Sequence, residues 1–235
     1  MNDFESIIYN AINLIITLDV ELFEIVILSL KISLSALLIS IIVSLPVGSV
    51  LAISKFFGRK FLIVTFNSLM GLPPVFVGLV LYLVFSANGP LGAIEILYTP
   101  YIMIIAQVVL ILPIMISLSR QIVEQIYEEY SELFSSLNAN GIEKMKAILW
   151  DGRYQLVTAI LAGLGRALSE VGAIIIVGGN IAHVTRVMTT TIALETSKGN
   201  LELATALGLI LLIISMIVNL FIEVLKSFSK KISYD

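Results

Sequence analysis

The chain has 235 residues, of which 58% are hydrophobic and only 13% are charged, and its mean hydropathy is +1.04. These values lie outside the range of soluble domains and indicate an integral membrane protein. The absence of cysteine excludes disulfide scaffolds, thiolate metal sites and cysteine nucleophiles, and a net charge of −3 is too small to indicate a partner. The N-terminus lacks the basic segment and cleavage site of a removable signal peptide, so we expect the first apolar helix to be retained.

Residues 4–15 carry apolar side chains at helical spacing, interrupted by Glu5, Asn10 and Asn13, which predicts a short helix at the membrane interface. Open strands cannot satisfy their backbone groups in hydrocarbon, and the apolar runs that follow lack the alternation of a membrane barrel. The predicted fold is therefore an all-α polytopic membrane protein with five transmembrane helices. The five runs are 25–53, 61–85, 100–118, 155–177 and 203–225.

The basic residues indicate the orientation in the membrane. They gather in the first loop, in the third loop and in the C-terminal tail, whereas the N-terminal arm carries only acids. Because positively charged loops stay in the cytoplasm, we expect a cell (plasma) membrane protein with the N-terminus outside and the C-terminus inside. The basic residues of the three regions are Lys55, Arg59, Lys60, Arg120, Lys144, Lys146, Arg153, Lys226, Lys230 and Lys231.

The second apolar run contains two adjacent prolines. Pro73 and Pro74 both lack a backbone N–H, and each ring crowds the carbonyl four residues earlier, so the helix must kink or break there. Broken helices in membranes line cavities, because their free backbone groups need protein or water. The segment 71–78 is therefore either a gate or pore wall, or a static kink.

The long polar segment between the third and fourth runs, about 121–153, is expected in the cytoplasm. Residues 121–133 are typical of a charged extension of the third helix, and 135–141 of a break. Residues 142–149 form a short amphipathic pattern whose apolar face includes Ile142 and Met145. Such a helix fits either a groove on a partner protein or the membrane surface.

The fourth run carries two opposite charges near its middle. Arg166 and Glu170 each cost roughly 2.5 to 3.5 kcal/mol at a helix centre, so they must face protein or a water-filled path. Their spacing of four lets them neutralise each other, which leaves a structural ion pair or contact with a passing anion as interpretations. Ala159, Gly163 and Ala167 recur every four residues and form a ridge that lets another helix approach closely.

The outer end of this run reads Gly178-Gly179-Asn180. Glycine ends helices and can expose backbone N–H groups, so this segment is either an anion-binding nest or a helix C-cap and turn. The only histidine, His183, has no His, Asp or Cys neighbour at ligand spacing, and we therefore expect no metal site.

The polar segment resembles the coupling loop of the permease subunits of small-type ATP-binding-cassette importers. Gly141 matches the family's glycine and 142–149 the helix that docks into the ATPase, whereas Ser135-Ser136-Leu137 stand where the family has Glu-Ala-Ala. The segments 165–173 and 177–181 are similar to the oxyanion branch of the family, and 185–190 and 194–200 resemble the tungstate permeases.

The resemblance implies a single permease domain over residues 1–235 that imports an oxyanion. Tungstate is the expected substrate, and molybdate and sulfate are the alternatives. It implies two cassette ATPase subunits and an extracytoplasmic oxyanion-binding protein as partners; membrane lipid is also expected, and nucleic acid is not. The residues implied in ATPase coupling are Ser135, Ser136, Gly141, Ile142 and Met145. The residues that we hypothesise to lie on the pathway or gate, from the chemistry of the breaks and charges described above, are Pro73, Pro74, Arg166, Glu170 and Asn180.

The sequence lacks a Gly-x-x-x-x-Gly-Lys-Ser/Thr motif, so we expect no cofactor in this chain and ATP hydrolysis in a partner. Five helices are few for an enclosed pathway, which together with the self-complementary ridge favours a homodimer. An intramembrane enzyme is disfavoured because the apolar runs contain no aspartate or histidine. A channel or an ATP-independent secondary transporter fits the composition but leaves the amphipathic cytoplasmic helix unexplained.

Overall fold

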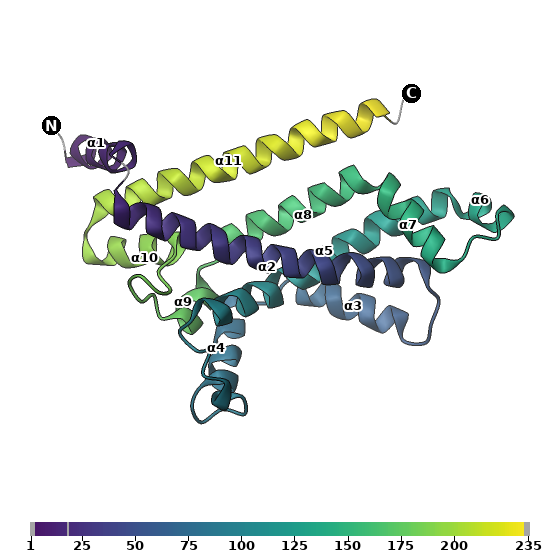
Figure 1. The fold of residues 1–235 in the computed structure, drawn as a ribbon, viewed down its shortest axis with the longest axis horizontal. Coiled ribbons are helices and arrows are strands. Elements are labelled where there is room, and N and C mark those ends of the chain that lie inside the picture. Colours follow the sequence, from purple (N-terminus) through teal and green to yellow (C-terminus); the bar gives the residue numbers. More distant parts are fainter. Residues whose placement is uncertain (1–2, 18, 233–235) are drawn as a thin grey trace. The chain divides into compact units, whose positions relative to one another are not determined.

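The computed structural model describes residues 3–17 and 19–232, with side chains for 4–17 and 19–224, so the side chains of Lys226, Lys230 and Lys231 lie outside the described residues. The described residues form helices and turns and contain no strand, which confirms the predicted all-α class. Figure 1 shows the helices in chain order. They are α1 (Asp3–Ile16), α2 (Val20–Ile53), α3 (Arg59–Leu69), α4 (Pro74–Phe85), the 3-10 helix η1 (Gly92–Ile94), α5 (Pro100–Glu129), α6 (Ser131–Ser136), α7 (Gly141–Asp151), α8 (Arg153–Leu168), α9 (Gly172–Gly178), α10 (Met188–Lys198) and α11 (Leu201–Ile232).

Among the described helices, α2, α5 and α11 are each long and apolar enough to cross a membrane, and the pairs α3 with α4 and α8 with α9 each make one further span when their short break is included. These five spans match the five predicted runs. The 34 residues of α2 measure about 51 Å, so this helix is longer than the hydrocarbon core of about 30 Å is thick. The extension of α5 to Glu129 agrees with the predicted charged continuation of the third helix.

The helices contribute to two compact units, each built from separate stretches of the chain: unit 1 (1–36, 73–107 and 165–217) and unit 2 (37–72, 108–164 and 218–235). An apolar cluster in unit 1 joins α1 to the first part of α2, to α10 and to α11, with Leu22 and Leu207 completely buried in it. Asn10 on α1 also donates a hydrogen bond to Glu202 on α11, at 2.7 Å. The exposed side of α1 still carries large apolar residues, as an interfacial helix requires: Phe4, Tyr9, Ile12 and Ile16.

The core of unit 2 joins the end of α2 to the polar segment. Ala52, Val123, Ile126, Phe134 and Ile148 form this cluster, so α6 and α7 pack against the extension of α5. The rings of Tyr127 and Tyr130 lie 6.3 and 6.1 Å from that of Phe134. The Tyr130 hydroxyl donates to Asp151 at 3.0 Å, and this hydrogen bond raises the pKa of the phenol. The polar segment is therefore a packed element with its own core.

The predicted ridge of small residues on α8 is covered within the chain. Ala159 and Ala167 are buried, and a Cβ added at Gly163 would lie 3.0 Å from the Met115 sulfur on α5. Because helices can approach closely only where side chains are small, the ridge sets the distance between α8 and α5. The ridge is therefore used within one subunit, and it no longer supports the expectation of a homodimer.

A pair of glycine variants tests this packing. We expect Gly163→Val to lower the free energy of unfolding by about 1 to 3 kcal/mol, because the new side chain overpacks against Met115. Gly165→Val, two residues along the same helix, is the matched control, since a Cβ there has no described atom within 4 Å. Thermal unfolding of the detergent-purified permease should show the larger loss for the first variant, and equal losses would contradict the assignment of the ridge.

Candidate functional site

The second span is interrupted at the predicted prolines. α3 ends at Leu69 and α4 begins at Pro74, with Pro73 extended at φ −66° and ψ 120°. The last turn of α3 tightens, since Gly71 N–H donates to the Ser68 carbonyl at 3.2 Å and Leu72 N–H donates to that of Leu69 at the same distance. The break thus places two residues without an N–H where a continuous helix would need two donors.

The fourth span is interrupted as well, which corrects the expectation of one helix over 155–177. α8 ends at Leu168 and α9 begins at Gly172. Ser169 donates its hydroxyl to the Arg166 carbonyl at 3.1 Å, and the Ala173 N–H donates to Glu170 Oε1 at 3.0 Å. Side chains that bond to nearby backbone in this way compete with the helical ladder, so local hydrogen bonds replace the helix at this point.

Glu170 is the centre of this second interruption. Its side chain is only 3% exposed; Oε2 accepts from Arg166 Nη1 at 2.8 Å, and Oε1 accepts from the first turn of α9. Its backbone carbonyl accepts from the Thr189 hydroxyl on α10 at 2.7 Å. Both carboxylate oxygens therefore have partners inside the protein. The Arg166 side chain is one-third exposed, so the arginine is the more accessible member of the pair.

Gln107 on α5 also contacts the break between α8 and α9, and the sequence analysis missed it. Together, Arg166, Glu170 and Gln107 form a polar junction at this break. Its Nε2 donates to the Ala167 carbonyl at 3.1 Å, at the end of α8, and contacts Ser33 Oγ at 3.3 Å. Its Oε1 is buried and has no hydrogen-bond partner among the described residues. It lines a small cavity of about 10 Å³ with Ser33 and Glu170, room for about one water. The available signal was a lone amide within an apolar run.

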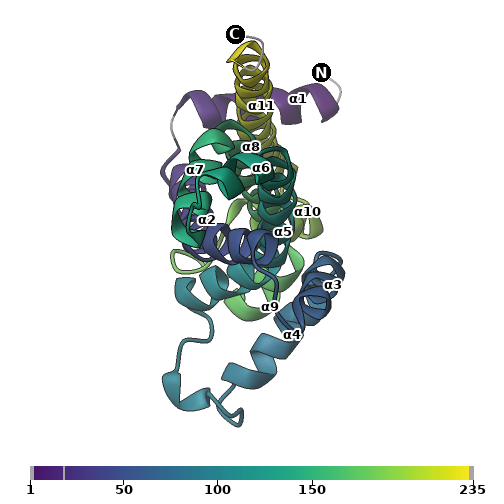
Figure 2. The ribbon, with the colours of Figure 1, turned by 90° about the vertical axis from the view of Figure 1, so that its right-hand side faces the viewer.

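The two interruptions meet inside unit 1, where α4 lies beside α9 (Figure 2). A Cβ added at Gly172 would lie 2.9 Å from Val75 Cγ2 and 3.6 Å from Pro74 Cβ. One added at Gly78 would lie 2.9 Å from the Ala173 Cα. The backbone of Ala173 therefore leaves no room for a Cβ at Gly78, and at Gly172 the nearest atom belongs to the Val75 side chain. The structure thus brings the proline break next to the start of α9, where the Ala173 N–H donates to Glu170.

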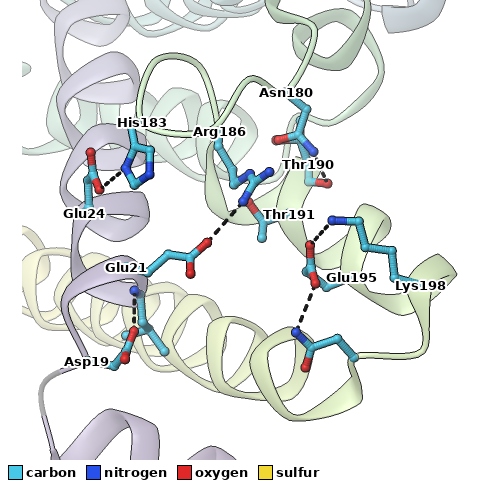
Figure 3. Close-up of polar contacts among 12 residues, drawn as sticks. Asp19, Glu21, Glu24, Asn180, His183, Arg186, Thr190, Thr191, Glu195 and Lys198 are labelled. Carbon is cyan, nitrogen blue, oxygen red and sulfur yellow. Dashed lines mark hydrogen bonds and ion pairs between the residues drawn. The ribbon is translucent and has the colours of Figure 1, made fainter.

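Asn180 makes its contacts elsewhere. It follows Gly179, whose φ of 69° ends α9 in the left-handed region as a C-cap glycine does. Its Nδ2 donates to the Thr190 carbonyl at 3.3 Å, and its Oδ1 accepts from the Thr190 hydroxyl at 2.9 Å, as Figure 3 shows. Both ends of the amide thus hold the loop to α10. This geometry favours the C-cap and turn over an anion-binding nest.

The residues predicted for ATPase coupling lie in α6 and α7 of unit 2. Ser135 and Ser136 belong to the last turn of α6, so the break begins two residues later than predicted and runs over 137–140. Asn140 caps α7 in a capping box with Glu143, a sequence signal that the analysis did not use. The coupling residues of α7 share a depression of about 370 Å³ with the end of α2, lined by Ser49, Val50, Ile53, Ser54, Asn140, Gly141, Ile142 and Met145.

No protein-family model matches the chain. A probable anion ABC transporter permease protein of Haloferax volcanii is 38% identical to it over 81% of this chain and 84% of the relative. The tungstate uptake system permease protein TupB of Peptoclostridium acidaminophilum is 38% identical over 89% of this chain and 92% of the relative, and TupB of Campylobacter jejuni is 34% identical over 72% and 70%. The chain belongs to this family of ABC transporter permeases. More distant relatives are named as molybdenum and sulfate transport permeases, at 28% and 27% identity.

In this permease, the loop after α9 is held to the start of α2 by two polar contacts (Figure 3). His183 Nδ1 lies 2.8 Å from Glu24 Oε2, and Arg186 Nη1 lies 3.1 Å from Glu21 Oε1. His183 is exposed, and the described residues contain no group of three or more His, Cys, Asp or Glu that could hold a metal. Ionic contacts at the surface contribute about 0 to 1 kcal/mol, so these two contacts position the loop but add little to the free energy of folding.

Variants of the buried ion pair test the junction. We expect Arg166→Gln to cost about 3 kcal/mol of stability, because it leaves the Glu170 carboxylate buried without its countercharge. Glu170→Gln should cost less, on the order of 1 kcal/mol, since an amide oxygen can still accept from Ala173 and Arg166 can reach solvent. The stability of the double variant should be close to that of Glu170→Gln alone. Additive losses in thermal unfolding would show that the two side chains do not interact.

The pH dependence of α10 gives another prediction. Glu195 is 5% exposed, and hydrogen bonds from Lys198 and Asn200 lower the pKa of its carboxyl. A lowered pKa in the folded state stabilises the fold above the ordinary glutamate range, and this contribution is lost as the pH falls through the lowered pKa. Glu195→Gln should therefore be less stable than the parent at pH 7, and the difference should shrink as the pH falls below about 4.3. Exposed Glu5, replaced by Gln, is the control, and a difference that stays constant with pH would contradict the assignment.

Proposed function

We propose that this chain is the permease subunit of an ABC importer for tungstate, delivered by an extracytoplasmic binding protein. The assignment of tungstate as the substrate rests on the 38% identity to a tungstate uptake permease over 92% of that protein's length. Molybdate and sulfate are the alternative substrates, and the relatives named for them are more distant. All three are tetrahedral oxyanions, so the same pathway chemistry serves each of them.

The polar junction suits an anion that must pass without being trapped. Glu170 has both oxygens engaged and neutralises Arg166, whose remaining guanidinium N–H groups are the accessible donors of the pair. Sites along a permeation path need to bind weakly enough to release the ion. In this proposal Arg166 faces the pathway, Glu170 positions it, and the break at Pro73 and Pro74 lines the wall. Asn180 holds the outer loop in place.

Coupling to ATP hydrolysis takes place through α7. Ile142 on its first turn is 63% exposed, whereas Ile148 on its last turns is fully buried in the core that includes the end of α2. A cassette ATPase that binds the first turn of α7 can therefore transmit its movement to α2 through this core. The orientation follows the positive-inside rule, with α7 in the cytoplasm and the N-terminus outside.

The complex contains two permease and two ATPase subunits in this proposal, and the chain itself binds no cofactor. Because the ridge of α8 is covered by α5, a second permease copy must use another surface. Only 11% of the most apolar stretch of α11 is buried within the chain. This helix therefore has apolar surface available for lipid or for a second permease copy.

Uptake by the reconstituted complex tests the function. Proteoliposomes with the permease, its ATPase and its binding protein should accumulate tungstate only with ATP, and excess sulfate should not compete. Uptake without ATP would indicate a channel or secondary transporter. Accumulation of molybdate or sulfate in preference to tungstate would assign the complex to one of the alternative substrates.

A size series at Gly141 tests the coupling role of α7. A Cβ there has no described atom within 4 Å, so Gly141→Ala and Gly141→Phe should both leave the permease folded. Only the large side chain obstructs a partner's groove, and we expect Gly141→Phe to lower transport and tungstate-stimulated ATP hydrolysis together by roughly tenfold or more, an interface loss of about 1.4 kcal/mol or more. Full coupling in the Phe variant would remove α7 from the ATPase interface.

A further inference from the structure

The turn between α2 and α3, in unit 2, has a fixed shape. Gly58 adopts φ +88°, in the left-handed region, and the Arg59 N–H closes the turn on the Phe56 carbonyl at 3.3 Å. α3 then begins at Arg59, and the Leu62 N–H donates to the Gly58 carbonyl at 3.1 Å. The five residues 54–58 thus form a tight connection between two helices that belong to membrane spans.

Arg59 anchors this turn from inside. Its Nε donates to the Leu51 carbonyl at 2.6 Å and its Nη2 to that of Ala52 at 3.4 Å, so it satisfies the last carbonyls of α2. Nη2 also pairs with Glu124 on α5 at 2.6 Å, and the same carboxylate pairs with Arg120. The Arg59 charge is therefore committed to the fold, and the turn is held at the end of α2.

The other charged and aromatic side chains of the turn point outward. Lys55 and Lys60 are exposed, and neither has a carboxylate partner among the described residues. Phe57 is fully exposed, and Phe61, one residue beyond Lys60, is 73% exposed. Residues 55–60 line a depression of about 350 Å³. Cations beside exposed phenylalanines, next to membrane spans, match the charged and apolar layers of a lipid interface.

We propose that this turn is a binding site for the head group of an anionic phospholipid in the inner leaflet. The phosphate binds between the ammonium groups of Lys55 and Lys60, and Phe57 and Phe61 enter the acyl chain boundary. Arg59 positions the turn without contacting the lipid. This site is separate from the transport pathway and does not depend on which oxyanion is carried.

Lipid binding to the full-length permease tests the proposal. Native mass spectrometry in detergent measures the affinity for a phosphatidylglycerol and for a phosphatidylcholine with the same acyl chains. Lys55→Gln with Lys60→Gln should weaken phosphatidylglycerol binding on the order of 30-fold, since each lysine near an anionic surface contributes about fivefold. Lys144→Gln with Lys146→Gln on α7 is the matched control, because it removes the same charge from the cytoplasmic side and should leave binding unchanged.

Two further measurements distinguish a lipid site from a site for a soluble anion. Phe57→Ser should weaken binding of both lipids, and inorganic phosphate at millimolar concentration should not displace phosphatidylglycerol. The proposal is overturned if the parent binds both lipids equally, or if the control pair loses as much affinity as the Lys55 and Lys60 pair. It is also overturned if inorganic phosphate displaces the lipid, which would indicate a soluble anion site, or if the Lys55 and Lys60 pair retains lipid binding but loses binding to the ATPase. Thermal unfolding of each variant confirms that the fold is intact.

Discussion

Hydrocarbon offers no hydrogen bonds, and so every interruption of a transmembrane helix must find its partners within the protein. This permease interrupts two of its five spans. At the break between α8 and α9, Gln107 satisfies the Ala167 carbonyl, and the Glu170 carboxylate satisfies the Ala173 N–H while Arg166 neutralises it. These contacts fix where α9 begins. They thereby fix its packing against α4, and the placing of the accessible arginine follows from the same contacts.

The two breaks differ in how far the sequence could predict them. The adjacent Pro73 and Pro74 predicted the first one, because together they remove two neighbouring backbone donors and crowd the preceding turn, whereas the single Pro46 and Pro113 lie inside α2 and α5. The second contains no proline, and Glu170 in an apolar run predicted only an ion pair. Besides the local hydrogen bonds of Ser169 and Glu170, it has tertiary partners: Gln107 and Thr189 donate to acceptors 60 and 19 residues away. Periodicity describes one helix at a time and so cannot reveal such partners.

The same distinction applies to the smaller elements. The class of fold, the five spans and the amphipathic α7 follow from hydropathy and spacing, and the membership of the permease family confirms the resemblance read from 165–181. The ridge of Ala159, Gly163 and Ala167 was visible as a packing surface, but its partner was not, because small residues specify close approach and leave the approaching helix open. That partner is α5 of the same chain, so the interface between permease copies has to be sought elsewhere.

A cysteine pair across the two breaks tests most directly whether they meet. The chain has no cysteine of its own, and the Val75 side chain lies 2.9 Å from a Cβ built at Gly172, within the reach of a disulfide once both residues are cysteine. Mild oxidation of the membrane-embedded Val75→Cys, Gly172→Cys permease should protect both thiols from maleimide labelling, whereas a Val75→Cys, Gly165→Cys control should stay reactive. If the first pair remains fully labelled, α4 and α9 do not meet and the polar junction does not position the pathway.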